Sequence, residues 1–104
     1  MPYRIAYDPD VRDNLRSLSA DARTQVFAAI EVQLRHRPDA ETRNRKRLMP
    51  NQVADWELRI GSLRVLYDVI VDEVRIRAVG TKRGERLYVA GKEVTLHDQD
   101  TARD

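Results

Sequence analysis

The chain has 104 residues, of which 41% are hydrophobic and 35% are charged. This length fits a single domain with one modest core, and the composition is that of a globular chain rather than a disordered one. No apolar run approaches the roughly 18 residues of a membrane span, and the first residues show no secretory signal. The lack of cysteine excludes disulfides and thiolate metal sites. We therefore expect one cytoplasmic domain over residues 1–104.

The basic residues are mostly arginines. The formal net charge is +2 and the isoelectric point about 9.2. Only three of the 19 basic residues are lysines, namely Lys46, Lys82 and Lys92. A guanidinium binds phosphate through two parallel hydrogen bonds and stays charged, whereas lysine acts as a point charge. The bias indicates either phosphate recognition or an arginine-rich codon usage, so the positions of the arginines have to decide between the two.

The N-terminal part predicts a strand and a first helix. Residues Tyr3–Tyr7 alternate as in a short strand. Asp8 followed by Pro9 is typical of a helix N-cap and a first helical position. The apolar residues of this helix follow at helical spacing and are Val11, Leu15 and Leu18.

A second helix is predicted from Ala20 to about Arg37, with Ser19 as its N-cap and Pro38 as its terminator. Its apolar residues form one stripe and are Ala22, Val26, Ala29, Ile30 and Leu34. Two helices joined by so short a connection are expected to form an antiparallel hairpin.

Beyond a polar connector, Pro38–Asn51, the hydrophobic period changes to that of strands. Three β-rich runs follow, Ala54–Ile60, Leu63–Val71 and Val74–Val79. Gly61 with Ser62 suits a two-residue type II′ turn, and Asp72 with Glu73 is the second predicted turn. The residues around Gly91 predict a further short hairpin, and residues 97–104 are expected to be a frayed polar tail.

Two-residue turns fix the register of this β meander and give the sheet two unlike faces. The apolar face should cover the helical stripe and holds Trp56, Leu58, Ile60, Leu63, Val65, Tyr67, Val69, Ile76 and Ala78. The other face holds Glu57, Arg59, Arg64, Leu66, Asp68, Ile70, Arg75 and Arg77. In this register Val69 pairs with Ile76 and Asp68 with Arg77.

On the polar face Arg59 and Arg64 are predicted to be direct cross-strand neighbours. Like charges in that relation are destabilising, so a sequence selected only for stability would avoid the pair. Glu57 can neutralise part of it. Arg77 can instead form an ordinary cross-strand ion pair with Asp68, which would make that arginine structural.

The central hairpin and the residues after it carry a recognisable pattern. It consists of Trp-Glu-Leu-Arg-Ile-Gly at residues 56–61, Arg-Val-Leu-Tyr at residues 64–67, Val79-Gly80, Lys82-Arg83 and Tyr88. Together with the order of strand, helical hairpin, basic segment and β meander, this pattern resembles the RelE/ParE toxin superfamily over about residues 3–89.

The resemblance implies a RelE-like α+β fold with the order β-α-α-β-β-β, in which a largely antiparallel β meander packs on the helices. It also implies the toxin of a type II toxin–antitoxin pair, with a cognate antitoxin protein as partner. RelE-like members cleave messenger RNA on the ribosome and inhibit translation. Two alternatives stay open: a ParE-like inhibitor of DNA gyrase that cuts no RNA, and a non-toxic binding module.

The resemblance also assigns candidate catalytic residues. Arg64 would stabilise the reacting phosphate and Arg59 would supply a second cation. Arg83 matches the basic residue after Val-Gly, and Tyr88 matches a late tyrosine that can donate or accept a proton or stack on a base. Glu57 departs from the pattern, because active RNases of this type often have lysine there. Candidate RNA-binding residues are Arg45, Lys46, Arg47, Arg75, Arg77 and Lys82.

Other nuclease chemistries lack their residues in this chain. His36 and His97 have no further metal ligand at useful spacing. The segment Gly80-Thr81-Lys82 lacks the spacing of a phosphate-binding glycine-rich loop. We therefore expect a metal-independent endoribonuclease that needs no cofactor.

Overall fold

The computed structural model describes residues 2–96. The polar tail expected at residues 97–104 lies outside the described residues. Within residues 2–96 neither helix is long and apolar enough to cross a membrane.

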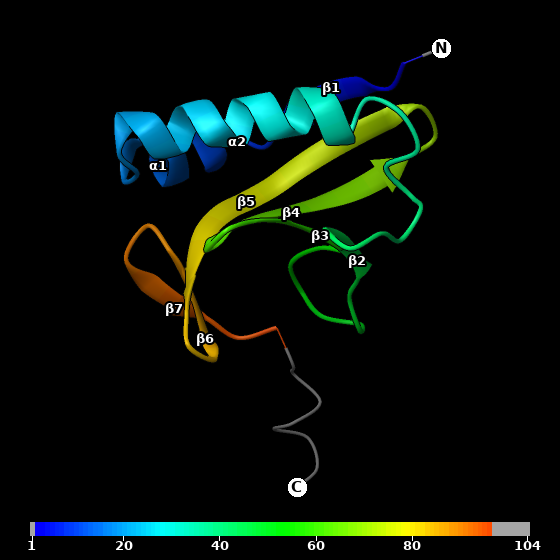
Figure 1. Cartoon of the computed structure of the whole chain (residues 1–104). Coiled ribbons are helices and arrows are strands. Elements are labelled where there is room, and N and C mark those ends of the chain that lie inside the picture. Colours follow the sequence, from blue (N-terminus) through cyan, green and yellow to red (C-terminus); the bar gives the residue numbers. More distant parts are fainter. Residues whose placement is uncertain (1, 97–104) are drawn as a thin grey trace, which may run out of the picture.

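A layer of two helices packs on one face of a twisted sheet (Figure 1). The chain begins with strand β1 (Arg4–Tyr7), followed by helices α1 (Val11–Arg16) and α2 (Ala20–Gln33). The remaining strands are β2 (Arg45–Arg47), β3 (Trp56–Ile60), β4 (Leu63–Ile70), β5 (Glu73–Arg83), β6 (Arg86–Val89) and β7 (Lys92–Val94). They are ordered β2-β3-β4-β5-β6-β7, with neighbours antiparallel, and β1 adds to β5 in parallel.

Strand β5 organises the sheet because three strands pair with it. Its first residues, Glu73–Ile76, pair with β1, and its last residues, Thr81–Arg83, pair with β6. Both lie on the edge opposite β4, which leaves a gap between them. There α1 supplies the missing partner: the buried side chain of Asn14 accepts a hydrogen bond from the Val79 amide at 3.0 Å. The helical layer is thereby tied to the middle of the sheet.

The predicted helices exist, but their ends differ. Ser19 caps α2 as expected, since its Oγ accepts a hydrogen bond from the Ala22 amide at 3.1 Å. The helix ends at Gln33 rather than near Arg37, which has a positive φ of 58°. The N-cap of α1 is Asp10 and not Asp8. Asp8 instead forms ion pairs with Arg75 and Arg77 of β5.

The expected polar connector contains a strand that the sequence did not indicate. Residues Arg45–Arg47 pair with β3 as the edge strand β2. Their side chains lack apolar alternation, so no strand period was visible. The edge is shielded from within the chain, because the Arg47 amide donates to Glu41 at 2.9 Å.

The first hairpin has the predicted register and the second does not. Gly61 adopts φ 58°, as the first position of a type II′ turn requires, and Arg59 pairs with Arg64. In the second hairpin Ile70 pairs with Glu73, so the turn consists of Val71 and Asp72. Val71 has a φ of 59°, which is strained for a β-branched residue. Asp72 is held by β1, since Arg4 contacts its carboxylate at 2.9 Å.

The new register changes the partners along β4 and β5. Val69 pairs with Val74 rather than Ile76, and Asp68 pairs with Arg75. A β-bulge follows, because Tyr67 pairs with Ile76 while Leu66 pairs with Ala78. Arg77 is thus an extra residue, and the faces of β5 are reversed beyond it.

As a result the sheet has a hydrophobic cluster on each side. The cluster under the helices contains most of the predicted core face, with the helix residues Val11, Val26, Ile30 and Leu34. Beyond the bulge Val79 joins it, and Ala78 lies in a second cluster, contrary to prediction. This second cluster consists of Ala54, Leu66, Ala78 and Leu87. It forms because the connector before β3 and the β6–β7 hairpin fold over the face that was expected to be polar.

Tyr67 links the sheet to the end of the helical layer. Its ring is fully buried and stacks on Trp56 at 6.1 Å between centroids. Its hydroxyl donates a hydrogen bond to the Pro38 carbonyl at 2.7 Å. Burial raises the pKa of Tyr67 above the ordinary value of a phenol.

We predict that Tyr67→Phe lowers the free energy of unfolding by about 1 kcal/mol at neutral pH, because the Pro38 carbonyl loses its partner. The raised pKa keeps Tyr67 neutral in the fold, whereas the unfolded chain ionises it from about pH 10. The stability contributed by this phenol is therefore present below about pH 10 and lost above it. Urea unfolding from about pH 9 to about pH 11 should show a shallower alkaline decline for the variant than for the wild type. Parallel curves would contradict this assignment.

Candidate functional site

Arg83 and Tyr88, two of the predicted catalytic residues, lie together. The Arg83 guanidinium lies 5.3 Å from the centroid of the Tyr88 ring, within the range of a cation–π contact. Strands β5 and β6 bring them together, since Thr81 pairs with Tyr88. Beside them is a hollow of about 350 Å³, whose lining includes Ser17, Leu18, Thr81, Arg83, Tyr88 and Ala90.

Gly80 permits this arrangement. A Cβ atom on Gly80 would overlap the carbonyl oxygen of Tyr88 and crowd the side chain of Val89. Strand β6 therefore approaches β5 at a distance that only glycine allows. The position of Tyr88 over the hollow depends on this close approach.

Arg59 and Arg64, the other two predicted catalytic residues, surround Glu57. The Glu57 carboxylate receives a hydrogen bond from Arg59 Nε at 3.1 Å and lies 3.8 Å from Arg64 Nε. The Glu57 side chain is 7% exposed and that of Arg64 is 13% exposed. Arg64 folds back onto the turn, where its Nη1 donates to the carbonyls of Gly61 and Leu63.

The structure thus divides the four residues into two pairs. Arg64 pairs with Gly80, so it shares a face of the sheet with Gly80 and with Lys82, two residues further along β5. Arg83 alternates to the other face, toward the loop between the helices. Lys82, a predicted RNA-binding residue, lines a small hollow with Glu57.

Two of the predicted RNA-binding residues of β5, Arg75 and Arg77, lie in a network of ion pairs. Arg75 contacts Glu73 and Asp8, and Arg77 contacts Asp68 at 2.8 Å and Asp8 at 3.1 Å. These hydrogen bonds raise the pKa of Arg77, with Asp68 as the main cause. The network includes the Asp68–Arg77 ion pair considered from the sequence. Their charges are largely compensated within the fold.

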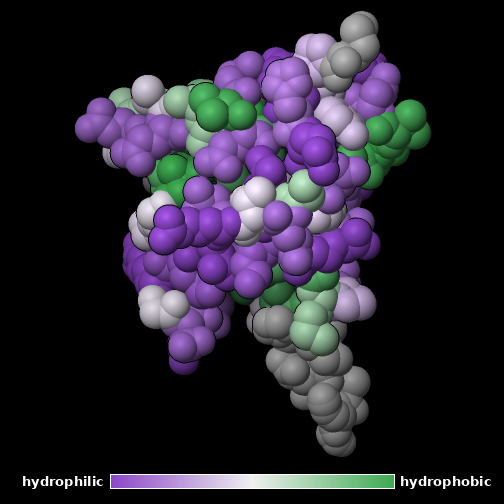
Figure 2. Space-filling model, turned by 45° about the vertical axis from the view of Figure 1, so that its right-hand side comes forward, coloured by the Kyte–Doolittle hydropathy of each residue, from purple (hydrophilic) through white to green (hydrophobic). Residues whose placement is uncertain are grey.

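The predicted RNA-binding residues of β2 differ in their surroundings. Arg45 is turned inward, where its guanidinium donates to the carbonyls of Ala40 and Gln33. Lys46 and Arg47 are exposed. Arg47 lies over the ring of Trp56 at 5.6 Å, and Trp56 itself is buried as expected. Hydrophilic side chains cover most of the face in Figure 2, and hydrophobic ones form separate small patches.

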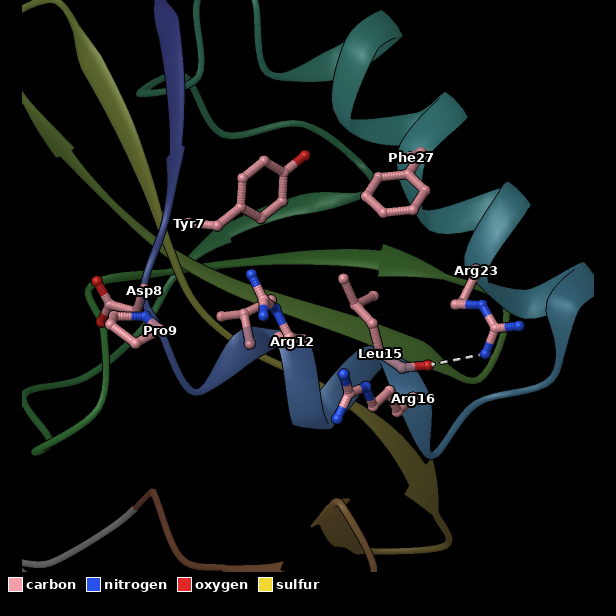
Figure 3. A pocket seen from close by; sticks show the side chains of 9 residues that line it. Tyr7, Asp8, Pro9, Arg12, Leu15, Arg16, Arg23 and Phe27 are labelled. Atoms are coloured by element: carbon pink, nitrogen blue, oxygen red, sulfur yellow. Dashed lines mark hydrogen bonds between the residues drawn. The ribbon is translucent and has the colours of Figure 1, made fainter.

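A groove between β1, α1 and α2 was not predicted. It has a volume of about 420 Å³ and a mostly apolar floor (Figure 3). Tyr7 and Phe27, each 41% exposed, meet edge to face across it at 6.2 Å. Its lining includes the side chains of Arg12, Arg16 and Arg23. Phe27 falls outside the apolar stripe of α2, and this was the one signal in the sequence for a second apolar surface on that helix.

We predict that Gly80→Ala lowers the free energy of unfolding by about 1–3 kcal/mol, because the backbone of β6 must move away from the added methyl group. Gly84→Ala is the matched control. Its φ of 59° makes a side chain costly, by about 1 kcal/mol, but nothing lies near the added Cβ atom. Only Gly80→Ala should also displace Tyr88, which the chemical shifts of that ring would report. Equal shifts in both variants would contradict the close-approach argument.

Comparisons with known proteins bear on the fold. No family model matches the chain, and no curated protein matches it. Among solved structures, a chain of the toxin–antitoxin complex RelBE2 from Mycobacterium tuberculosis matches with a TM-score of 0.63 and 21% sequence identity. The match covers 79% of this chain and 100% of that one. The strand, helical hairpin and antiparallel meander expected from the sequence are confirmed, and the chain has a RelE-like α+β fold.

Proposed function

We propose that this protein is the toxin of a type II toxin–antitoxin system and acts as a ribosome-dependent messenger RNA endonuclease. The observation that carries the proposal is the Arg83 guanidinium over the Tyr88 ring, beside a polar hollow of about 350 Å³. A likeness to a chain of a toxin–antitoxin complex supports the toxin assignment. The proposed target places the protein in the cytoplasm.

The proposed reaction is cleavage by the RNA's own 2′-hydroxyl. It needs a group that exchanges protons with the reacting oxygens and a cation that stabilises the negative phosphorane. The Tyr88 phenol would do the first and the Arg83 guanidinium the second. Neither role requires a metal ion. The exposed residues Lys46 and Arg47 and the partly buried Lys82 would contact the phosphate backbone. Arg59 and Arg64 would also bind it, on the face of the sheet that Lys82 shares.

We expect expression of the chain alone to arrest growth and to create new 5′ ends within translated messenger RNA, dependent on ribosomes. Arg83→Ala and Tyr88→Phe should each reduce the cleavage rate by about 100-fold or more, because each removes a group that acts in the transition state. Arg4→Ala is the matched control, since this exposed arginine pairs with Asp72 at a distant turn. Sequencing of transcript ends measures all three.

Full cleavage by both site variants would refute the assignment of Arg83 and Tyr88. Loss of cleavage in the Arg4→Ala control as well would show a general effect of charge or folding. Circular dichroism of each variant separates these outcomes from misfolding.

A second candidate is a ParE-like protein that inhibits DNA gyrase by binding and cuts no RNA. It is favoured by the contacts of Arg59 and Arg64, because the buried carboxylate of Glu57 compensates the charges that an RNase would use on the phosphate. Growth arrest with intact transcripts and loss of DNA supercoiling would support this candidate. Harmless expression without any antitoxin would instead point to a non-toxic binding module.

We further propose that an antitoxin docks in the groove between β1, α1 and α2. An apolar floor suits one face of an amphipathic helix. The arginines that line the groove, Arg12, Arg16 and Arg23, would pair with acidic residues on its flanks. We therefore expect the docking segment to be an acidic amphipathic helix.

We predict that Phe27→Glu weakens antitoxin binding by at least about 2 kcal/mol, because it places a charge on the apolar floor. Val32→Glu is the control, since Val32 lies on the same helix, is 78% exposed and does not line the groove. The antitoxin is first found by selecting fragments of the encoding genome that rescue growth. Its affinity for both variants is then measured by calorimetry.

Equal affinities for the two variants would exclude the groove as the docking site. They would leave the RNase assignment intact, because that assignment rests on Arg83 and Tyr88, neither of which lines the groove.

A further inference from the structure

Glu57 is an acid in a setting that makes a buried charge costly. It lies in β3 with its side chain 7% exposed, opposite Leu66 of the second hydrophobic cluster. A carboxylate so far from water is stable only if cations compensate it. Arg59 and Arg64 provide that compensation, since each places Nε toward a different oxygen of the carboxylate.

The two contacts are unequal. Arg59 Nε donates to Oε1 at 3.1 Å, which is a hydrogen bond. Arg64 Nε is 3.8 Å from Oε2, too far for one, and this buried nitrogen has no hydrogen-bond partner within residues 2–96. A buried donor without an acceptor costs about 1–3 kcal/mol. Glu57 therefore satisfies one arginine and leaves the other with a free donor.

A phosphate group would fit between these arginines better than the carboxylate does. Its oxygens are spread over a tetrahedron, so one can accept from Arg59 while another reaches Arg64. A phosphate would also relieve the repulsion between two guanidiniums that are direct cross-strand partners. The Arg59 side chain is 42% exposed, which gives an anion a route to the pair from solvent.

We propose that Arg59 and Arg64 form a binding site for a phosphate oxyanion, and that Glu57 is an internal counter-ion that occupies this site until the phosphate replaces it. In the context of the proposed function, on which this choice of ligand rests, the phosphate is a phosphodiester of bound RNA. Glu57 then lowers the affinity of the protein for RNA, because RNA has to displace the carboxylate before it can bind the two arginines. A hollow of about 150 Å³ beside Glu57 gives the displaced carboxylate room to move, and its lining carries the cations Lys82 and Arg86 as well as the acids Glu85 and Glu93.

The test compares Glu57→Gln with Glu31→Gln. Both replace a glutamate that pairs with an arginine, and both raise the net charge by one. Glu31 lies on α2, pairs with Arg35 at 2.9 Å and is far more exposed. Glutamine keeps the size of Glu57 and can still accept a hydrogen bond from Arg59, so the fold should be retained. Each variant is assayed by thermal unfolding before any binding experiment.

The first probe is a single-stranded RNA of about 12 nucleotides, titrated at several salt concentrations. Glu57→Gln should bind at least about tenfold more tightly than Glu31→Gln at low salt. Its plot of log affinity against log salt should be steeper by about 0.7 for each phosphate gained. Adding Arg59→Gln to Glu57→Gln should remove this gain.

The second probe is inorganic phosphate against chloride at equal ionic strength. Phosphate should raise the unfolding temperature of Glu57→Gln more than that of Glu31→Gln. A gain with RNA supports the backbone as ligand. A gain with inorganic phosphate alone supports the anion site but assigns it to free phosphate.

Equal behaviour of the two variants toward both probes would overturn the proposal. That failure is separate from failure of the proposed function, which is judged by transcript ends in cells expressing the wild-type chain. Tight RNA binding by the wild type, unchanged in Glu57→Gln, would likewise show that Glu57 is only structural.

Discussion

The bulge of β5 at Arg77 decides which side chains reach which layer of the molecule. Before the bulge, Val74 and Ile76 face the helices; beyond it Val79 does so, and Ala78 turns to the opposite cluster. An extra residue in one strand bends that strand and increases its twist. The two ends of β5 therefore pair with different strands, β1 and β6, and one strand takes part in two cores.

The same bulge divides the candidate site. In an unbroken meander Thr81 and Arg83 would share a face with Arg64, and the four predicted catalytic residues would meet. The extra residue reverses the alternation, so that Gly80 is opposite Arg64 and Arg83 turns to the helical side. The hollow beside Tyr88 and the cluster around Glu57 are thus two separate environments, one a polar hollow and the other a charged cluster that is largely buried at Glu57 and Arg64. The structure places the guanidinium of Arg83 against the Tyr88 ring, so Arg83 is the cation available to any chemistry proposed at Tyr88.

The sequence was sufficient to predict those parts of the fold whose conformation is determined by residues close to one another in the chain. The cap at Ser19, the apolar stripe of α2 and the Gly61 turn are of this kind, and so is the Arg59–Arg64 pairing that the turn fixes. The second hairpin could not be predicted in this way. A polar Asp-Glu turn is favoured locally, yet Glu73 pairs with both Ile70 of β4 and Arg4 of β1, which leaves Val71 and Asp72 in the turn and Val71 at a positive φ.

The other features that the sequence did not predict also depend on contacts between residues that are distant in the sequence. Strand β2 has a basic sequence and becomes a strand only because β3 offers it an edge. The second cluster depends on the fold-back of β6 and β7 over Leu66, a residue that alternation assigns to a solvent face. The groove beside Phe27 depends on the angle at which α1 and β1 meet α2 (Figure 3). None of these contacts produces a periodic pattern of apolar residues from which it could be predicted.

The charges around Glu57 are difficult to explain by stability alone. Replacing a buried ion cluster with apolar residues of similar size is often neutral or stabilising, whereas here three charged side chains occupy adjacent positions of two strands. Exposure falls from 42% at Arg59 to 13% at Arg64, so the cluster opens to solvent at one end. An anion arriving from solvent would contact Arg59 first, at the stronger of the two bonds that hold Glu57. Breaking that bond would release the carboxylate from Arg59 and expose the unsatisfied Arg64 Nε to the incoming oxygen.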